Sequence, residues 1–130
     1  MLSIVRTADV LMQRAADAFK DFDLSGPQYN VLRILRGSPE GLSCGEIAER
    51  MISRDPDITR LLDRLEARGF IRRARDIRDR RVVMARISAE GRALLEKLDP
   101  KILAMHKRQL GRMGGEKLRE LIALLEEARQ

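Results

Sequence analysis

The chain has 130 residues, the length of one domain that buries roughly two thirds of its unfolded surface without disulfides or metals. Its 26 lysines and arginines exceed its 20 aspartates and glutamates, and its one cysteine excludes an internal disulfide and any zinc site built from several cysteines. Three phenylalanines, one tyrosine and no tryptophan disfavour a base-stacking surface, and without a signal-peptide pattern or a long apolar run we expect a soluble, cytoplasmic protein that does not bind a membrane.

The first segment, Leu2 to Phe22, predicts a helix with two apolar stripes. One stripe takes positions 4, 8, 11, 15 and 22, and the other takes positions 5, 12, 16 and 19. A helix that is apolar on two sides needs two neighbours to cover it.

Residues 25–28 read Ser-Gly-Pro-Gln, the S-x-x-Q pattern of a capping box with proline in the first turn. This pattern predicts a helix that runs through Leu35 and ends at Gly37. Its core side would carry Tyr29, Leu32 and either Leu35 or Ile34.

Two short helices follow, separated by only a few residues. Residues 43–46 read Ser-Cys-Gly-Glu, a second capping box, which starts a helix to about Met51. Asp55-Pro56 has the pattern of an N-cap followed by the first helical residue, and this helix would run to Arg68 and stop at Gly69. The pair predicts a helix-turn-helix.

The period changes after Gly69. Residues 70–75 and 82–87 are short β-prone segments around a charged tip at 76–81, and Val83, Ala85 and Ile87 alternate onto one face. A helix pair followed at once by a hairpin predicts a winged helix, and hence a mainly α fold with a small β-wing.

The rest of the chain predicts helices. Ser88 caps a long helix that we expect to bend at Asp99-Pro100, because proline removes an intrahelical bond. Its apolar residues are Leu94, Leu95, Leu98, Ile102, Leu103 and Met105. After the glycines at 111, 114 and 115, a final helix carries Leu118, Leu121, Ile122 and Leu125.

The helix predicted at 56–68 places its apolar residues on one side and leaves an outward face. Ile58, Leu61, Leu62 and Leu65 form the apolar side. A recognition helix enters the major groove with its N-terminal half, so Arg54, Thr59 and Arg60 are candidates for base edges or nearby phosphates. Arg64 and Arg68 would reach the DNA backbone.

Residues 70–87 contain seven arginines and two aspartates, a net charge of +5 in a protein of +6. Like charges so close together repel in the free protein but release counterions beside phosphates, which favours a polyanionic partner. A carboxylate at Asp79 could hold Arg81 toward the minor groove, where Arg78 would also contact DNA. Asp79 is equally compatible with ordinary turn chemistry.

Four ordered motifs resemble those of the MarR family of winged helix-turn-helix transcription regulators. They are LSGPQYNVLRIL, LSCGEIAERM, DITRLLDRLEARGFIRR and DRRVVMARISAEG. The resemblance covers about residues 3 to 128 and implies a single domain over 1–130. Within it, residues 25–87 form the winged helix DNA-binding part, and residues 1–22 and 88–130 form N- and C-terminal dimerisation helices.

The resemblance also implies function. Thr59 and Arg60 match DNA-facing positions of the recognition helix, and Asp79-Arg80-Arg81 matches the wing element that supplies a minor-groove arginine. A homodimer would bind pseudo-palindromic double-stranded DNA, repress transcription and be released by a small aromatic ligand. That ligand would bind in a cleft lined by Met12, Ala16, Tyr29 and Arg33.

Two features depart from the family pattern. Asp55-Pro56-Asp57 places acids at the start of the recognition helix, where many relatives carry small hydroxyl residues, so the bases read are left open. Peroxide-sensing relatives carry a reactive cysteine in the first helix, whereas Cys44 falls in a later one. A buried or inert thiol is the simpler expectation for Cys44.

Two other function classes stay open, namely a winged helix that binds an acidic protein partner and a thiol redox-sensing regulator acting through Cys44. No cofactor or metal site is indicated, and no nucleophile lies near a base in sequence. We therefore expect no enzymatic activity.

Overall fold

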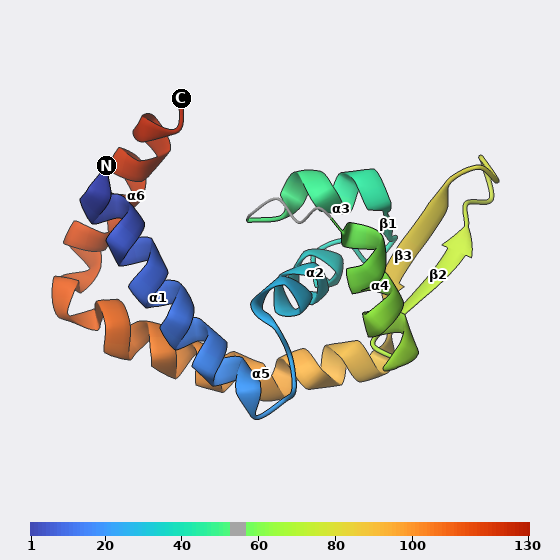
Figure 1. Cartoon of the computed structure of the whole chain (residues 1–130), viewed down its shortest axis with the longest axis horizontal. Helices are drawn as coiled ribbons and strands as arrows, with labels where there is room; N and C mark the ends of the chain where they lie inside the picture. The colour runs from blue at the N-terminus through green and yellow to red at the C-terminus, as the bar shows by residue number, and fades with distance from the viewer. Residues whose placement is uncertain (53–56) are drawn as a thin grey trace. The chain divides into compact units, whose positions relative to one another are not determined.

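The computed structural model describes residues 1–52 and 57–130 (Figure 1). These residues form two compact units: a central unit of residues 19–98, and a terminal unit of residues 1–18 and 99–130. The elements, in chain order, are α1 (Leu2–Lys20), α2 (Gly26–Arg36), β1 (Leu42–Ser43), α3 (Cys44–Arg50), α4 (Ile58–Ala67), β2 (Ile71–Arg75), β3 (Val83–Ile87), α5 (Ala89–Leu110), the 3-10 turn η1 (Gly111–Met113) and α6 (Gly114–Ala128). The predicted fold class, mainly helical with a small β-wing, is confirmed.

Side-chain caps start the helices of the central unit. The Ser25 hydroxyl accepts from the Gln28 backbone N–H at 3.2 Å, and the Gln28 side chain accepts from the Ser25 backbone N–H at 3.0 Å, which confirms the first capping box. At the start of α3, the Ser43 hydroxyl accepts from the Glu46 backbone N–H at 3.2 Å.

The predicted start of α4 was wrong. The Asp55-Pro56 pair lies outside the described residues, and the helix begins at Ile58. Its N-cap is Asp57, whose carboxylate accepts from the Arg60 backbone N–H at 3.1 Å. Aspartate is a strong N-cap residue, and both Asp55 and Asp57 precede the apolar residues of this helix. The sequence therefore left the first residue of α4 ambiguous.

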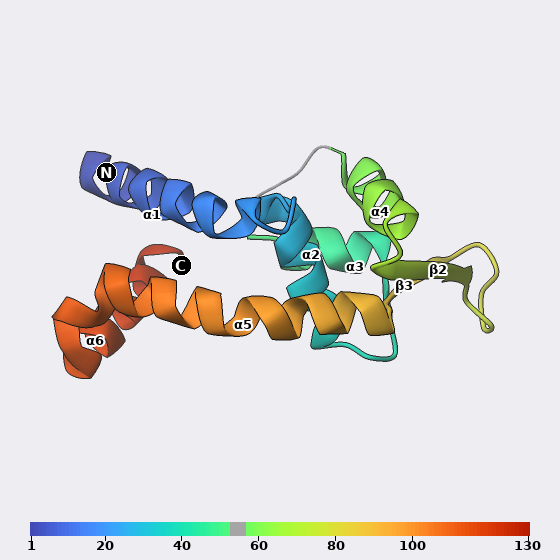
Figure 2. The ribbon, with the colours of Figure 1, turned by 90° about the horizontal axis from the view of Figure 1, so that it is seen from below.

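A three-stranded antiparallel sheet has the order β1-β3-β2. β2 and β3 form the predicted hairpin, with Ile71 opposite Ile87 and Arg75 opposite Val83. Together with the connecting residues 76–82 this hairpin is called the wing below, and it extends away from the helices of the central unit (Figure 2). Strand β1 was not predicted, because two residues are too few to show an alternating pattern.

The face of β3 that we expected to be apolar is only partly covered. Ala85 is buried and Ile87 is half-buried, whereas Val83 is 42% exposed. Val83 pairs with Arg75 at the end of the hairpin nearest the tip, where the wing has passed beyond the core.

The core of the central unit is built from α2, α4 and the first half of α5. Leu32, Leu35, Leu65, Leu95 and Leu98 are all completely or almost completely buried. The expected core residue Tyr29 is only half-buried, and its ring stacks on Phe19 with the centroids 4.6 Å apart.

The terminal unit leaves most of its apolar residues in contact with solvent. In α5, Ile102 and Met105 are buried but Leu103 is 56% exposed. Among the residues of α6, none is buried: Leu118 and Leu121 of its predicted apolar stripe are half-buried, and Ile122 and Leu125 are exposed. Helix α5 continues through Pro100, and the bend expected there stays a prediction.

Ser88 joins the end of the wing to α5. Its hydroxyl accepts from the Gly91 backbone N–H at 3.0 Å, which confirms the predicted cap, and donates to the Gly69 carbonyl at 2.6 Å. This close approach leaves no room beside Gly91, because a Cβ there would overlap the Phe70 carbonyl oxygen and lie 2.8 Å from an Ile87 side-chain carbon.

We expect Gly91→Ala to destabilise the protein by about 1–3 kcal/mol, since the overlapping atom at Phe70 belongs to the backbone. Thermal unfolding measures the effect. Gly45→Ala in α3 is the matched control, because its Cβ would meet nothing within 4 Å, and alanine is the better helix former. Equal melting temperatures for the two variants would contradict this account of the wing-to-α5 junction.

Candidate nucleic-acid interface

Helix α4 has one buried face and one exposed face. Ile58, Leu61, Leu62 and Leu65 are buried, as predicted from their spacing. The outward residues Thr59, Arg60 and Arg64 are exposed, also as predicted. The fourth candidate in this region, Arg54, lies outside the described residues. The helix therefore offers a polar surface that starts at its N-terminal end.

The tip of the wing is organised by Asp79. One carboxylate oxygen of Asp79 accepts from the Arg81 backbone N–H at 3.0 Å, the geometry of an Asx turn, and the same oxygen lies 3.5 Å from the Arg81 Nε. The Arg81 side chain is 94% exposed. An ion pair so exposed adds little stability, so the main physical effect of Asp79 is its hydrogen bond to the Arg81 backbone, which shapes the turn.

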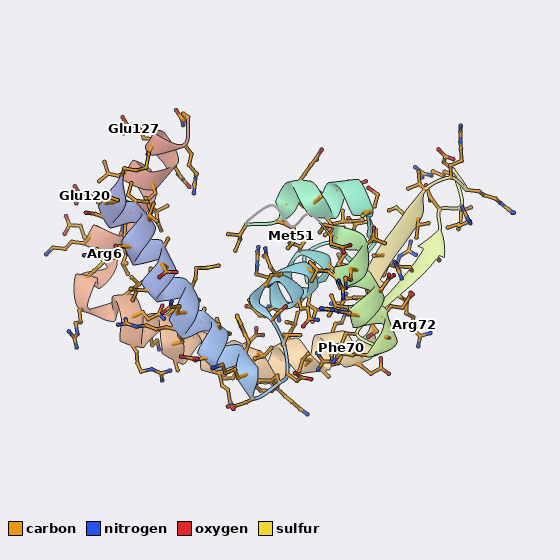
Figure 3. The ribbon with its side chains drawn as sticks, viewed as in Figure 1. Arg6, Met51, Phe70, Arg72, Glu120 and Glu127 are labelled. Atoms are coloured by element: carbon orange, nitrogen blue, oxygen red, sulfur yellow. The ribbon has the colours of Figure 1, made fainter. Side chains whose placement is uncertain are left out.

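The arginines of the wing divide into two groups. We expected all seven arginines of residues 70–87 to favour a polyanionic partner, but three of them have acceptors within the protein. Arg75 donates to the Arg80 carbonyl at 2.7 Å, Arg86 donates to the Glu40 carbonyl at 2.9 Å, and Arg73 pairs with carboxylates of α4. The exposed arginine group consists of Arg72, Arg78, Arg80 and Arg81. Arg75 and Arg86 are also exposed, but their guanidinium groups donate to backbone carbonyls. Arg72 lies near the base of the wing, and side chains ending in nitrogen extend outward from the tip (Figure 3).

Arg73 on β2 is bound by two acids of α4. Its guanidinium donates to Asp63 at 2.5 Å and to Glu66 at 3.0 Å, while its backbone N–H donates to the other Glu66 oxygen at 2.9 Å. The hydrogen bond from Arg73 holds the pKa of Glu66 below its ordinary value of 4.5, and the bond to Glu66 raises the pKa of Arg73. These contacts of Arg73 with Asp63 and Glu66 are called the clamp below.

Arg68 is exposed, but its guanidinium is bound within the protein, whereas we expected it to reach the DNA backbone. Its guanidinium donates to the backbone carbonyls of Phe22 at 3.0 Å and Asp23 at 2.5 Å, and it lies 4.8 Å from the centre of the Phe70 ring. Sequence periodicity could not reveal this role, because the carbonyls come from a turn some 45 residues earlier in the chain.

The four residues predicted for a ligand cleft lie in different units. Met12 and Ala16 belong to the terminal unit and are exposed, whereas Tyr29 and Arg33 belong to the central unit. Arg33 donates to the Asn30 side chain at 2.7 Å. The cleft stays a prediction.

Sequence reasoning missed an open groove within the central unit. It is lined by Lys20, Asp23, Leu24, Ser25, Gln28, Arg64, Ala67 and Arg68 and has a volume of about 620 Å³. Its residues come from the end of α1, the turn after it, the first turn of α2 and the end of α4. The turn after α1 was not expected to lie against α4.

Other expectations concern isolated features. Of the two alternatives expected for Cys44, a buried thiol was wrong because Cys44 is exposed, whereas an inert thiol stays a prediction; its position in the first turn of α3 is confirmed. Within residues 1–52 and 57–130, no three His, Cys, Asp or Glu side chains are arranged to hold a metal ion. Over the same residues, no helix is long and apolar enough to cross a bilayer.

A helix-turn-helix followed directly by a small antiparallel sheet with an arginine-bearing hairpin is the architecture of winged helix-turn-helix transcription regulators. Residues 24–83 match the MarR family model. The chain is 42% identical to a MarR transcription factor of Planctomyces limnophilus, whose crystal structure superposes with a TM-score of 0.75 over 96% of this chain and 91% of that one. The chain belongs to the MarR family.

Two curated relatives agree with this membership. The transcriptional regulator TtmR of Methylorubrum extorquens is 46% identical over 77 residues, which are 59% of this chain but only 39% of that protein. The homoprotocatechuate degradative operon repressor of Escherichia coli is 26% identical over 97% of this chain and 84% of its own length. The protein is thus a DNA-binding transcription regulator and not an enzyme, as the sequence indicated.

The clamp generates a prediction for the acid range. Because the folded-state pKa of Glu66 is lowered, its stabilising contribution is complete above about pH 4.5 and is lost as the pH falls through the folded value. We expect the side-chain carboxyl carbon of Glu66 in NMR titration to have its midpoint below 4.5, and Arg73→Gln to raise that midpoint. An unchanged Glu66 midpoint in Arg73→Gln would show that the clamp does not form in solution.

Proposed function

We propose that this protein is a homodimeric repressor that binds a pseudo-palindromic operator, with α4 as the recognition helix in the major groove and the wing beside the minor groove. The observation that carries the proposal is the exposed arginine group on the wing, next to the exposed polar face of a helix that packs against β2. Both surfaces belong to the central unit.

Each residue of the recognition helix has a proposed role. Thr59 and Arg60 lie in its first turn, the part of such a helix that reaches base edges. Arg64, one turn later, would contact phosphates. Arg54 is proposed to contact DNA just before the helix.

The wing supplies the second contact. Arg81 would enter the minor groove, where the narrow width concentrates negative potential, and Asp79 would hold it in that direction. Arg78, exposed at the same tip, would bind a phosphate. The Asp79 carboxylate supports this assignment because it accepts from the Arg81 backbone N–H at 3.0 Å and so shapes the turn that carries the exposed Arg81 side chain.

Dimerisation is supported by the apolar residues that the terminal unit leaves uncovered. Large apolar side chains at more than 50% exposure on α1, α5 and α6 include Ile4, Val5, Met12, Leu103, Ile122 and Leu124. A second copy would bury them and place two recognition helices about one turn of DNA apart. Occlusion of a promoter by such a dimer represses transcription, and the E. coli relative above is named a repressor.

A small aromatic ligand is proposed to release the operator by binding among Met12, Ala16, Tyr29 and Arg33. Their chemistry supports this class of ligand, since apolar and aromatic surface would hold a ring and one guanidinium would bind an acidic group.

We expect Arg60→Ala and Arg81→Ala each to weaken specific operator binding about tenfold in gel-shift titrations, the range for an arginine that contacts a groove. Lys97→Ala is the matched control, because it removes one exposed positive charge from the same unit outside α4 and the wing. Its affinity should be close to that of the wild type.

A salt titration of the same proteins separates the possible partners. For DNA, log K should fall with log salt by about 0.9 for each phosphate neutralised. Retention of acidic proteins but of no duplex DNA at low salt would point to an interaction module instead. Loss of an oxidant response in Cys44→Ser, with DNA binding intact in reducing buffer, would point to a thiol switch.

The dimer is tested by light scattering after size-exclusion chromatography. Ile122→Glu should weaken dimerisation at least about tenfold, because it places a charge in an apolar interface. Glu49→Lys, a larger charge change at an exposed position of α3 and outside the dimerisation helices, should leave the mass unchanged. A wild-type chain that stays monomeric at every concentration would rule out the two-fold arrangement.

A further inference from the structure

We propose that Arg73 is a positioning residue, which through Asp63 and Glu66 fixes the wing against the recognition helix so that both reach DNA together. This inference rests on the proposed function. Arg73 itself would not touch DNA, unlike the exposed arginines beside it in the sequence.

The clamp ties both the backbone and the side chain of one strand residue to α4. The Arg73 backbone N–H and Nε donate to opposite oxygens of Glu66, at 2.9 and 3.3 Å, and its terminal nitrogen bridges Glu66 and Asp63. Asp63 and Glu66 are three residues apart, so they lie on one face of the helix. The Arg73 side chain is 22% exposed, less than either acid. Several contacts in fixed directions restrain rotation of β2 about the helix more than a single ion pair would.

The location of the clamp explains why such a restraint matters. Arg60 precedes Asp63 by one turn of α4, and Arg73 lies in the part of the wing nearest the helices. A strand rises about 3.3 Å per residue, so a small rotation near Arg73 becomes a displacement of several ångströms at Arg81. The recognition helix and the wing tip can then be placed correctly only if the angle between them is fixed.

Two other roles for Arg73 make different predictions. Arg73 could simply neutralise acids that would otherwise repel phosphates, since Asp63 is 58% exposed. It could also only stabilise the fold. Neutralisation would act through net charge, and a stabilising role would lower the folded fraction without changing how much Arg81 contributes.

The experiment compares operator affinity, by fluorescence anisotropy, among the wild type, Arg73→Gln, Arg81→Ala, the Arg73→Gln/Arg81→Ala double variant and the Asp63→Asn/Glu66→Gln/Arg73→Gln triple variant. The clamp residues carry a net charge of −1 in the wild type, −2 in Arg73→Gln and 0 in the triple variant. The triple variant therefore loses the clamp while becoming more favourable to DNA in charge. Circular dichroism melts confirm that each variant is folded at the assay temperature.

We expect Arg73→Gln and the triple variant both to bind about tenfold more weakly than the wild type, as though a groove-contacting arginine were lost. The operator affinity of the double variant should also be about tenfold below that of the wild type, and not about a hundredfold. Once the wing is no longer positioned, Arg81 cannot reach DNA, so its removal costs no further affinity. If Arg73→Gln alone fails to fold, the triple variant and Arg73→Lys, which keeps the charge but lacks the planar fork, provide the same comparison.

Wild-type affinity in the triple variant would overturn the proposal in favour of charge neutralisation. Additive losses in the double variant would overturn it in favour of a stabilising role. If Arg73→Gln binds as tightly as the wild type while Arg81→Ala binds weakly, the proposed function stands and the positioning role falls. If the wild type itself retains no duplex DNA, the proposed function fails.

Discussion

Concentrated positive charge is the constraint around which the central unit is organised. Seven arginines within residues 70–87 would raise the free energy of the folded state if all of them faced solvent together. The fold binds the guanidinium groups of Arg73, Arg75 and Arg86 to carboxylates or backbone carbonyls, although Arg75 and Arg86 stay exposed like the other four. The arginines that are bound shape the wing, and those that are exposed give it its charge. A single run of like residues therefore serves two physical purposes.

Helix α4 connects the wing to the core of the central unit. Its four buried apolar residues fix its orientation about its own axis, so that Thr59, Arg60 and Arg64 face outward. Its polar side also carries Asp63 and Glu66, which hold β2, while Arg68 at its end holds the turn after α1. The position of the polar surface is thus set by contacts with the core, the wing and the preceding turn. A change in any one of them would be transmitted to the proposed DNA-reading residues.

Patterns local in sequence predicted the local structure. The capping box at Ser25, the N-cap at Ser43, the apolar face of α4 and the hairpin all have signals within a few residues, because caps and amphipathic faces are short-range features. The partners of Arg68 and Arg86 lie about 45 residues away, and β1 gains its strand conformation only by pairing with β3. Local sequence cannot distinguish an arginine that donates to a carbonyl of the protein from one that is free to contact a phosphate. Hence the candidate residues were found, but Arg68 was assigned the wrong role.

The acids beside the proposed interface follow from the same geometry. A carboxylate near DNA is repelled by the phosphates, so it is expected there only where it makes a favourable hydrogen bond or ion pair within the protein. Asp57 caps α4, where the helix dipole favours a negative charge, Asp63 pairs with Arg73, and Asp79 pairs with Arg81. Each of these acids therefore has a donor at hydrogen-bonding distance on or next to the surface it borders. Each acid keeps its negative charge when it is paired, so these contacts do not raise the positive potential of the surface. They satisfy the carboxylates within the protein and fix the start of α4, the position of β2 and the turn at the wing tip.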